Sequence, residues 1–112
     1  SVLFNGDRFR MWYQAWAQEN DGTDSLCIGC VESDDGIHWT RPSHGLIERG
    51  GSRDNHLTGL PLHAPSVIID PHVDDDRRYR AFGYHVPSDG RGYYTAHSAD
   101  GLRWTTEPGP YV

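Results

Sequence analysis

Residues 33–39 read SDDGIHW, and residues 98–104 read SADGLRW. Both segments follow the pattern Ser-x-Asp-Gly-aliphatic-x-Trp, and the second copy lies 65 residues after the first. A pattern that fixes both a Gly and a Trp rarely recurs by chance, and a repeat at this spacing indicates a chain built from copies of one supersecondary unit. The sequence therefore predicts two copies of the same structural unit.

The similarity between the two copies continues upstream of this pattern. Residues 1–4 (SVLF) align with residues 66–69 (SVII) at the same spacing, and residues 9–13 (FRMWY) align with residues 79–83 (YRAFG) at a spacing of 70. The extra residues fall in the polar segment 70–78, and surface loops accept added length at small cost. Each copy predicts an apolar strand, a turn, an aromatic strand, a loop, a third strand, an Asp-Gly hairpin and a strand that begins at Trp.

The predicted strands are short and are separated by turn residues. In segment 9–16, Phe9, Met11 and Tyr13 are expected on one face and Arg10 and Trp12 on the other, since side chains alternate along a strand. The chain divides into a first repeat with its connector, 1–62, and a second repeat, 63–112, within one continuous structural unit. Predicted strands are 2–4, 9–16, 26–32 and 37–40, then 66–70, 79–85, 92–98 and one starting at 102–104, with a loop at 18–24.

Composition points to an all-β fold. The 112 residues include 13 Gly and 7 Pro, and 4 Trp, 6 Tyr and 3 Phe supply much of the apolar surface. Frequent Gly and Pro suit short strands and tight turns, and a few large aromatic rings can fill a small core. No segment shows sustained apolar residues at helical spacing.

Charge and motifs exclude several classes of function. The formal net charge is −6, which disfavours nucleic acids and anionic membrane surfaces as partners, because both require clustered basic residues. Apolar runs are too short for a membrane span. No phosphate-binding glycine loop or metal-binding pair of histidines is present, so no cofactor and no metal are expected.

Cys27 and Cys30 form a Cys-x-x-Cys pair. A redox motif would need a following helix to lower the thiol pKa, and a zinc site would need a second pair of ligands. Residues three apart on a strand point to opposite faces, which disfavours a local disulfide. The sequence predicts two small strand residues, one in the core and one near the surface.

The residues of the repeated pattern have structural duties. Asp35 and Asp100 are expected to accept hydrogen bonds from the turn backbone, while the following Gly supplies a positive φ. The Ser is expected to close the turn, and the Trp ring to pack beneath the hairpin. A catalytic role for either Asp is disfavoured.

The repeat also resembles a known family. Residues 35–42 (DGIHWTRP), followed by GLIE at 45–48 and GSRDN at 51–55, resemble the blade repeat of five-bladed β-propellers of the glycoside hydrolase family 32-like and 43-like group, uncharacterised bacterial members especially. The pattern is also similar to the Asp-box of sialidases, although here Asp and Gly are adjacent. The resemblance implies blades of four antiparallel strands and a carbohydrate-related function.

Fewer than two units of this length fit in the chain, whereas a closed propeller needs roughly four to eight blades. Two isolated blades leave sheet edges and an inter-blade apolar face uncovered. We therefore expect either a segment of a longer propeller or copies that associate into a homo-oligomer through these faces.

The resemblance implies that the innermost strands, 2–4 and 66–69, line a central funnel with candidate site residues at its rim. His63 is a candidate for binding a sugar hydroxyl or a cation, with a loop His bonded to backbone as the alternative. Asp54 and Asn55, followed by His56, reach the funnel mouth or cap a turn. Asp70, before Pro71, is similar to the Asp-Pro of the family 32-like signature or belongs to a solvated turn.

Glycoside hydrolysis needs two carboxyl groups about 5–10 Å apart, and the sequence is not expected to contain that full set. Trp12, Trp16, Tyr93 and Tyr94 are candidates for stacking on sugar rings, with a place in the core as the alternative. Two hypotheses follow: a glycoside hydrolase-like propeller segment, or a non-catalytic repeat module that binds carbohydrate or protein and self-assembles.

Overall fold

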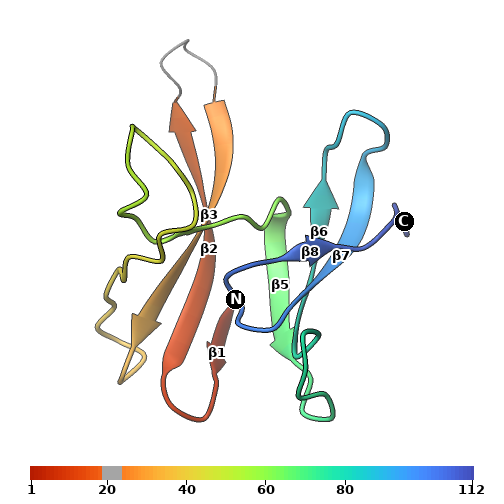
Figure 1. Ribbon diagram of the computed structural model, residues 1–112. Helices are drawn as coiled ribbons and strands as arrows, with labels where there is room; N and C mark the ends of the chain where they lie inside the picture. The colour runs from red at the N-terminus through yellow and green to blue at the C-terminus, as the bar shows by residue number, and fades with distance from the viewer. Residues whose placement is uncertain (19–23) are drawn as a thin grey trace.

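The protein folds into two four-stranded antiparallel sheets, in each of which the strand order follows the chain (Figure 1). The computed structural model describes residues 1–18 and 24–112. The prediction of an all-β fold with two four-stranded, blade-like repeats is confirmed, and most of the predicted loop 18–24 lies outside the described residues. The first sheet contains β1 (Val2–Phe4), β2 (Phe9–Gln18), β3 (Asp24–Ser33) and β4 (Leu57–Thr58). The second sheet contains β5 (His63–Ile69), β6 (Tyr79–His85), β7 (Gly92–Ser98) and β8 (Thr105–Thr106).

Among the described residues, no helix is long and apolar enough to cross a membrane. Every named element of the described residues is a strand, which agrees with the absence of helical periodicity in the sequence.

The alternation predicted for β2 is confirmed. Trp12 lies opposite Cys30, and Arg10 lies opposite Glu32, so these four side chains share the face that meets the second sheet. Tyr13 points to the other face, where its ring stacks on that of His56 at a centroid distance of 5.8 Å. The second face of the first sheet is thus covered in part by the connector before β4.

The fourth strand of the first repeat is not where the sequence predicted it. Residues 37–40 form no strand, and only Thr40 bridges back to β3, through Glu32. Pro42 cannot donate a ladder hydrogen bond, so pairing ends there, and β4 instead begins at Leu57 beside Gly29. In the second repeat β8 begins at Thr105, directly after the segment 102–104 where the strand was predicted to start.

The main core lies between the two sheets and draws on both repeats. The connector between β4 and β5 contributes two leucines that lie beside the sheet residues. The buried residues of this core are Trp12, Ile28, Cys30, Leu60, Leu62, Val67, Tyr79, Ala81, Tyr94 and Ala96. Because the second sheet supplies half of this cluster and the first sheet and the connector supply the rest, neither repeat has a complete core of its own.

Both cysteines are free, as predicted, with Cys30 buried and Cys27 partly exposed. Cys27 Sγ accepts a hydrogen bond of 3.1 Å from Arg49. Burial raises the pKa of the Cys30 thiol to about 12, so this side chain is a small apolar core residue.

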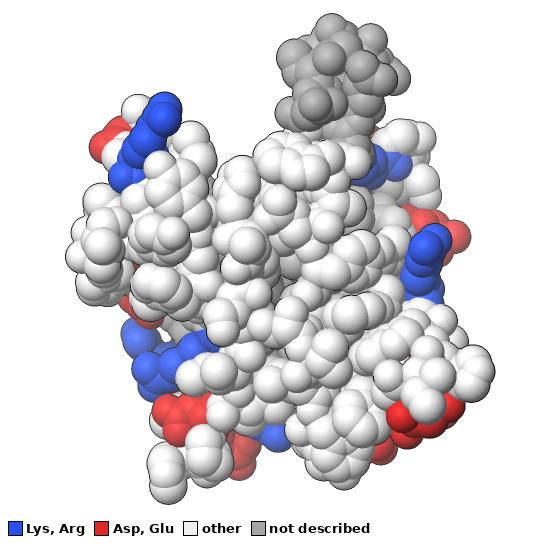
Figure 2. Space-filling model, turned by 180° about the vertical axis from the view of Figure 1, so that it is seen from behind, with Lys and Arg blue, Asp and Glu red and all other residues white. Residues whose placement is uncertain are grey.

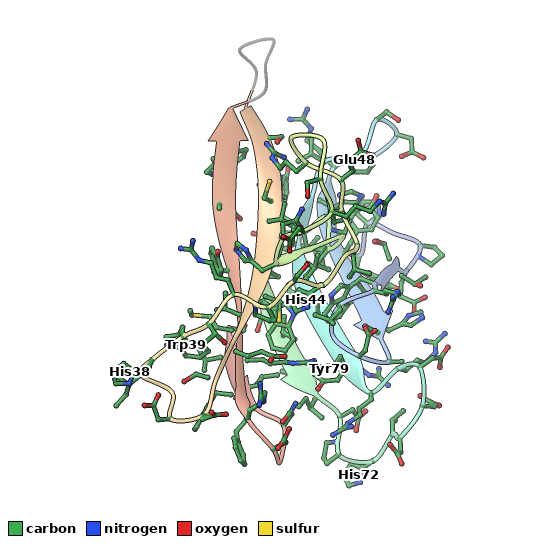
Figure 3. All side chains as sticks on the ribbon, turned by 60° about the vertical axis from the view of Figure 1, so that its left-hand side comes forward. His38, Trp39, His44, Glu48, His72 and Tyr79 are labelled. Carbon is green, nitrogen blue, oxygen red and sulfur yellow. The ribbon has the colours of Figure 1, made fainter. Side chains whose placement is uncertain are left out.

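The two sheets are joined where the Asp-Gly turn of the second repeat meets β2. Trp12 Nε1 donates a 2.7 Å hydrogen bond to the Gly101 carbonyl, and Arg10 donates one of 2.6 Å to the Asp100 carbonyl. Tyr79, labelled in Figure 3, packs against the Trp12 ring at a centroid distance of 5.9 Å. The second repeat is therefore seated on the first through its turn.

The two copies of the turn have the same hydrogen bonds. Ser33 Oγ and Ser98 Oγ donate to the Asp side chain two residues on, at 3.0 and 3.1 Å, and accept from the Gly amide, each at 2.9 Å. Asp35 Oδ1 accepts from two following amides, and Asp100 Oδ1 does the same. The structural role predicted for both Asp residues agrees with these contacts.

Candidate functional site

The start of β5 is irregular, and it is the point where the candidate residue His63 lies. His63 pairs with Tyr84 and Ser66 pairs with Phe82, so the intervening residues form a bulge. Ala64 in this bulge has φ of 46°, in the left-handed region that non-glycine residues seldom adopt. Such strain, of order 1–3 kcal/mol, persists where the surroundings enforce it and often marks a functional site.

Two neighbours hold the bulge in place. Gln14 on β2 accepts a 2.6 Å hydrogen bond from the Ala64 amide through its Oε1. Gly83 on β6 lies beneath the bulge, and a Cβ there would lie 2.9 Å from the His63 carbonyl oxygen. Glycine at position 83 thus permits the close approach that sets His63 at the edge of the sheet.

A continuous row of aromatic rings begins at this bulge and crosses the second sheet; we name it the aromatic strip. Its neighbouring rings lie 5.3–6.4 Å apart between centroids. In order along the row, the members are Trp16, His63, Tyr84, Tyr93 and Phe82. Three different strands beyond β2 supply the last four rings, so only the folded sheet assembles the row.

The outer rings of the aromatic strip are open to solvent. Trp16 is 58% exposed, and Tyr93 and Phe82 are each 43% exposed, while His63 and Tyr84 are half-buried. On the face seen in Figure 2, charged side chains gather at the margins and uncharged residues fill the centre. Exposed aromatic faces attached to a constrained backbone suit flat, uncharged or weakly polar ligands.

The outward side of the second sheet also carries a shallow groove of about 550 Å³. Phe82 and Ile68 line its apolar part, and Glu107 lies at its polar end. Glu107 Oε1 lies 2.5 Å from His97 Nδ1 and accepts a 3.1 Å hydrogen bond from Arg77.

Sequence reasoning did not single out the Glu107 and His97 pair. His97 pairs with Thr105 in the β7–β8 ladder, which brings the residue two positions after Thr105 to the same face. Extending the predicted strand beyond Trp104 would have placed Glu107 beside His97.

Two of the predicted stacking residues are not at the surface. Trp12 is 1% exposed between the sheets, and Tyr94 is buried with its hydroxyl donating 2.6 Å to the Gly90 carbonyl. For these two rings the place at the surface is wrong and the core alternative holds, because the facing sheet covers this part of their strands. Trp16 and Tyr93, in contrast, are exposed as expected.

The other candidates lie in turns away from the aromatic strip. Asp54 is exposed, and its amide bonds to Ser52 Oγ at 3.0 Å. Asn55 Nδ2 donates 2.8 Å to the Ile47 carbonyl, and its Oδ1 accepts from Leu57. These contacts fit the turn-capping alternative stated for both residues.

Asp70 directly follows β5 and lies in a hydrogen-bonded turn. Its Oδ1 accepts a 2.9 Å bond from the His72 amide, and its Oδ2 lies 3.4 Å from Arg80. Residues 74–76 are exposed. The structure therefore places Asp70 in the solvated turn that was its alternative, at the far end of β5 from His63.

Across the described parts of the chain, no group of three or more His, Cys, Asp or Glu side chains is placed to hold a metal ion. The aromatic strip offers stacking on its rings together with hydrogen bonding by His63 and the tyrosine hydroxyls.

Comparison with known proteins finds distant relatives. The chain is similar to the uncharacterized protein Rv1502 of Mycobacterium tuberculosis strain H37Rv, with 30% identity over 105 residues and 92% of this chain covered. It is also similar to the uncharacterized protein MT1551 of strain CDC 1551, with 33% identity over 107 residues. The chain spans 31% of the length of each. No family model matches, and no solved structure matches significantly.

Proposed function

We propose that the chain is a pair of glycoside hydrolase-like propeller blades that binds carbohydrate at the Trp16 end of the aromatic strip. The observation that carries this proposal is the exposed Trp16 ring, which lies 5.6 Å from the His63 ring at a strained bulge. An aromatic face binds the apolar face of a sugar ring, and His63 and the Tyr84 hydroxyl supply hydrogen bonds for its hydroxyl groups.

The lengths of the relatives support the propeller part of the proposal. A match of 105 residues that spans 31% of Rv1502 gives a protein of about 340 residues. Such a length has room for about five units of the 65-residue repeat seen here. Five blades fall within the usual range of roughly four to eight.

For the residues that the structure describes, carbohydrate binding is favoured over glycoside hydrolysis. A glycosidase needs one carboxyl group as acid and a second as nucleophile or base, on either side of the bond. Glu107 is the carboxylate in the lining of the groove, and both His97 and Arg77 engage its Oε1. Asp70, the other family-like candidate, is bonded within its own turn.

The test is titration with short oligosaccharides, including fructo-, xylo- and arabino-oligosaccharides, followed by tryptophan fluorescence and calorimetry. We expect a sugar to change the emission of Trp16, the exposed tryptophan. Trp16→Ala should weaken binding severalfold, up to about tenfold, since stacking on one aromatic ring contributes roughly 0.5–1.5 kcal/mol. His63→Ala should weaken it to a smaller degree.

Phe4→Ala is the matched control, because Phe4 is as exposed as Trp16 and lies outside the aromatic strip. It should bind sugar like the unmodified protein. An affinity that Trp16→Ala leaves unchanged would contradict the proposal, as would the absence of binding across the panel. Turnover of aryl glycosides or fructans by the unmodified chain would instead favour the hydrolase hypothesis.

A further inference from the structure

The repeat allows each residue of the second sheet to be compared with its counterpart in the first. Phe82 and Arg80 occupy the positions of Trp12 and Arg10, which hold the turn of the second repeat. Trp12 is 1% exposed, whereas Phe82 is 43% exposed. Ile28 is buried, while its counterpart Tyr93 is exposed. We name this uncovered side of the second sheet, formed by Ile68, Arg80, Phe82, Tyr93 and Thr95, the receiving face.

In the contact between the two sheets, the second repeat contributes apolar residues that pack against the first sheet. The corresponding residues of the first repeat are exposed. Val67 is 2% exposed in the core between the sheets, but its counterpart Val2 is 52% exposed. Ile69 and Leu102 pack against that core, whereas their counterparts Phe4 and Ile37 are exposed. We name Val2, Phe4, Ile37 and the turn 33–39 the free turn face. Figure 3 shows His38, in this turn, at the outer margin of the molecule.

We propose that the receiving face of one molecule binds the free turn face of a second copy of the same chain. The contact would repeat the one seen between the two sheets of a single molecule, with Phe82 over Gly36 in the way that Trp12 lies over Gly101. Gly36 and Gly101 have φ values of 75° and 76°, and their turns share the same hydrogen bonds. Every molecule therefore carries both the receiving face and the free turn face.

Charge favours a second copy as the occupant. The turn 33–39 carries Asp34 in the position of Ala99, so it is more acidic than the turn already bound. The groove on the receiving face is lined by Arg77, Arg80 and Glu107, and Glu107 accepts a hydrogen bond from Arg77. Arg80 contacts Asp70 at 3.4 Å while 47% exposed, and it is the counterpart of Arg10, which donates to the Asp100 carbonyl. Arg80 is therefore the cation that would meet the acidic turn, and opposite charges across a contact are complementary.

The contact is heterologous, because it joins different surfaces of the two copies. Such contacts build closed rings or open chains instead of symmetric dimers with one shared patch. The receiving face overlaps the Tyr93 and Phe82 end of the aromatic strip, while Trp16 and His63 lie at its other end. Association and sugar binding therefore use adjoining but different residues.

The test is the molar mass by light scattering and sedimentation velocity across the micromolar concentration range. The mass should exceed that of one chain and rise with concentration. Arg80→Glu on one face and Ile37→Asp on the other should each raise the dissociation constant about tenfold or more, as for a central interface residue. Both side chains are exposed, so the variants should fold, which circular dichroism checks.

A mixture of the two variants provides the decisive comparison. Each carries one intact half of the contact, so mixing Arg80→Glu with Ile37→Asp should restore a heterodimer but no longer assembly. Arg91→Glu, with the same charge change in the exposed 87–91 turn, should associate normally. A monomer throughout the concentration range would overturn the proposal, and so would association that neither variant weakens. Trp16→Ala should leave the mass unchanged, which separates this proposal from sugar binding.

Discussion

The glycine of the repeated turn has the same backbone conformation in both copies but different surroundings. At Gly36 the heavy atoms nearest to a Cβ would be ring carbons of Phe9, at 3.7 Å. At Gly101 a Cβ would lie 2.8 Å from the Trp12 ring and 3.3 Å from Tyr79. The difference arises because only the second turn is enclosed by another repeat.

We predict that Gly101→Ala destabilises the protein more than Gly36→Ala. Both substitutions force a non-glycine residue into the left-handed region, at a cost of about 1–2 kcal/mol. Gly101→Ala adds overpacking against Trp12, which typically costs a further 1–3 kcal/mol. Urea unfolding of the two variants measures the difference in their free energies of unfolding. Equal losses of stability would contradict the claim that only the turn at Gly101 is enclosed.

A second prediction concerns the two thiols. Cys30 is buried and its thiol pKa is raised to about 12 by burial, while Cys27 is partly exposed. The thiolate is the reactive form, and both burial and the raised pKa keep Cys30 from reacting as a thiolate. The partly exposed Cys27 should therefore react first. Under native conditions we expect at most one thiol to react promptly with a disulfide reagent, and both in denaturant. Peptide mapping should identify the first as Cys27, and prompt labelling of Cys30 would contradict the buried site.

Sequence reasoning was most successful where a residue type has one main structural use. The Asp, Gly and Ser of the turn were placed correctly, because few alternatives satisfy a tight hairpin. Aromatic residues were harder, since a ring serves a core and a sugar platform equally well. Trp12 and Trp16 lie on the same side of β2, yet only Trp12 is enclosed, because the second repeat covers only part of that strand.

At the level of the element, each Asp-Gly turn is held together by hydrogen bonds to the carboxylate of its Asp. Partial burial alone would raise the pKa of Asp100, but it is outweighed by hydrogen bonds from the Arg103 and Leu102 amides, Ser98 and the Arg103 guanidinium, which hold it below its usual value. In the exposed copy, His38 and the backbone amides hold the pKa of Asp35 well below its usual range. Each carboxylate is therefore more easily kept ionised in the folded chain than in the unfolded chain.

We predict that acid destabilises the protein through these turns. A carboxyl group with a lowered folded pKa contributes stability above its unfolded pKa, about 3.9 for Asp, and loses that contribution as the pH falls through the folded value. Stability should therefore decline as the pH falls below about 4. Asp100→Asn should be less stable at neutral pH and show a shallower decline. A decline as steep as that of the unmodified protein would contradict this role.

The position of the fourth strand in the first repeat could not be predicted from the order of strands in the second repeat. The sequence of the second repeat continues from Trp104 into β8, and the first repeat was expected to do the same from Trp39. Only Thr40 pairs, and a connector of 16 residues separates it from β4. In this connector the His44 amide donates to the Asn55 carbonyl, and His44 Nε2 lies 2.9 Å from the Cys30 carbonyl oxygen on β3. These long-range contacts leave no local pattern in the sequence.

At the level of the whole molecule, the two repeats share one core. Trp12 and Cys30 of the first sheet pack with Val67 and Tyr79 of the second. Ser1 reinforces this junction, because its Oγ donates to the Pro65 carbonyl and accepts from the Val67 amide at 2.9 Å. β1 and β5 consequently lie side by side in the middle of the molecule (Figure 1). A repeat separated from its neighbour would expose most of its apolar side chains.

We therefore predict that both sheets unfold together. Amide hydrogen exchange should give the same free energy of opening for β2 and for β6, because neither sheet keeps a core once the interface separates. Trp12→Ala should lower that free energy by about 3–5 kcal/mol in both strands, the usual cost of removing a fully buried large aromatic ring. Trp16→Ala, on the same strand but exposed, should change it little. If β6 stayed protected in Trp12→Ala while β2 opened, the second repeat would fold alone, and the shared core would not be what holds this chain together.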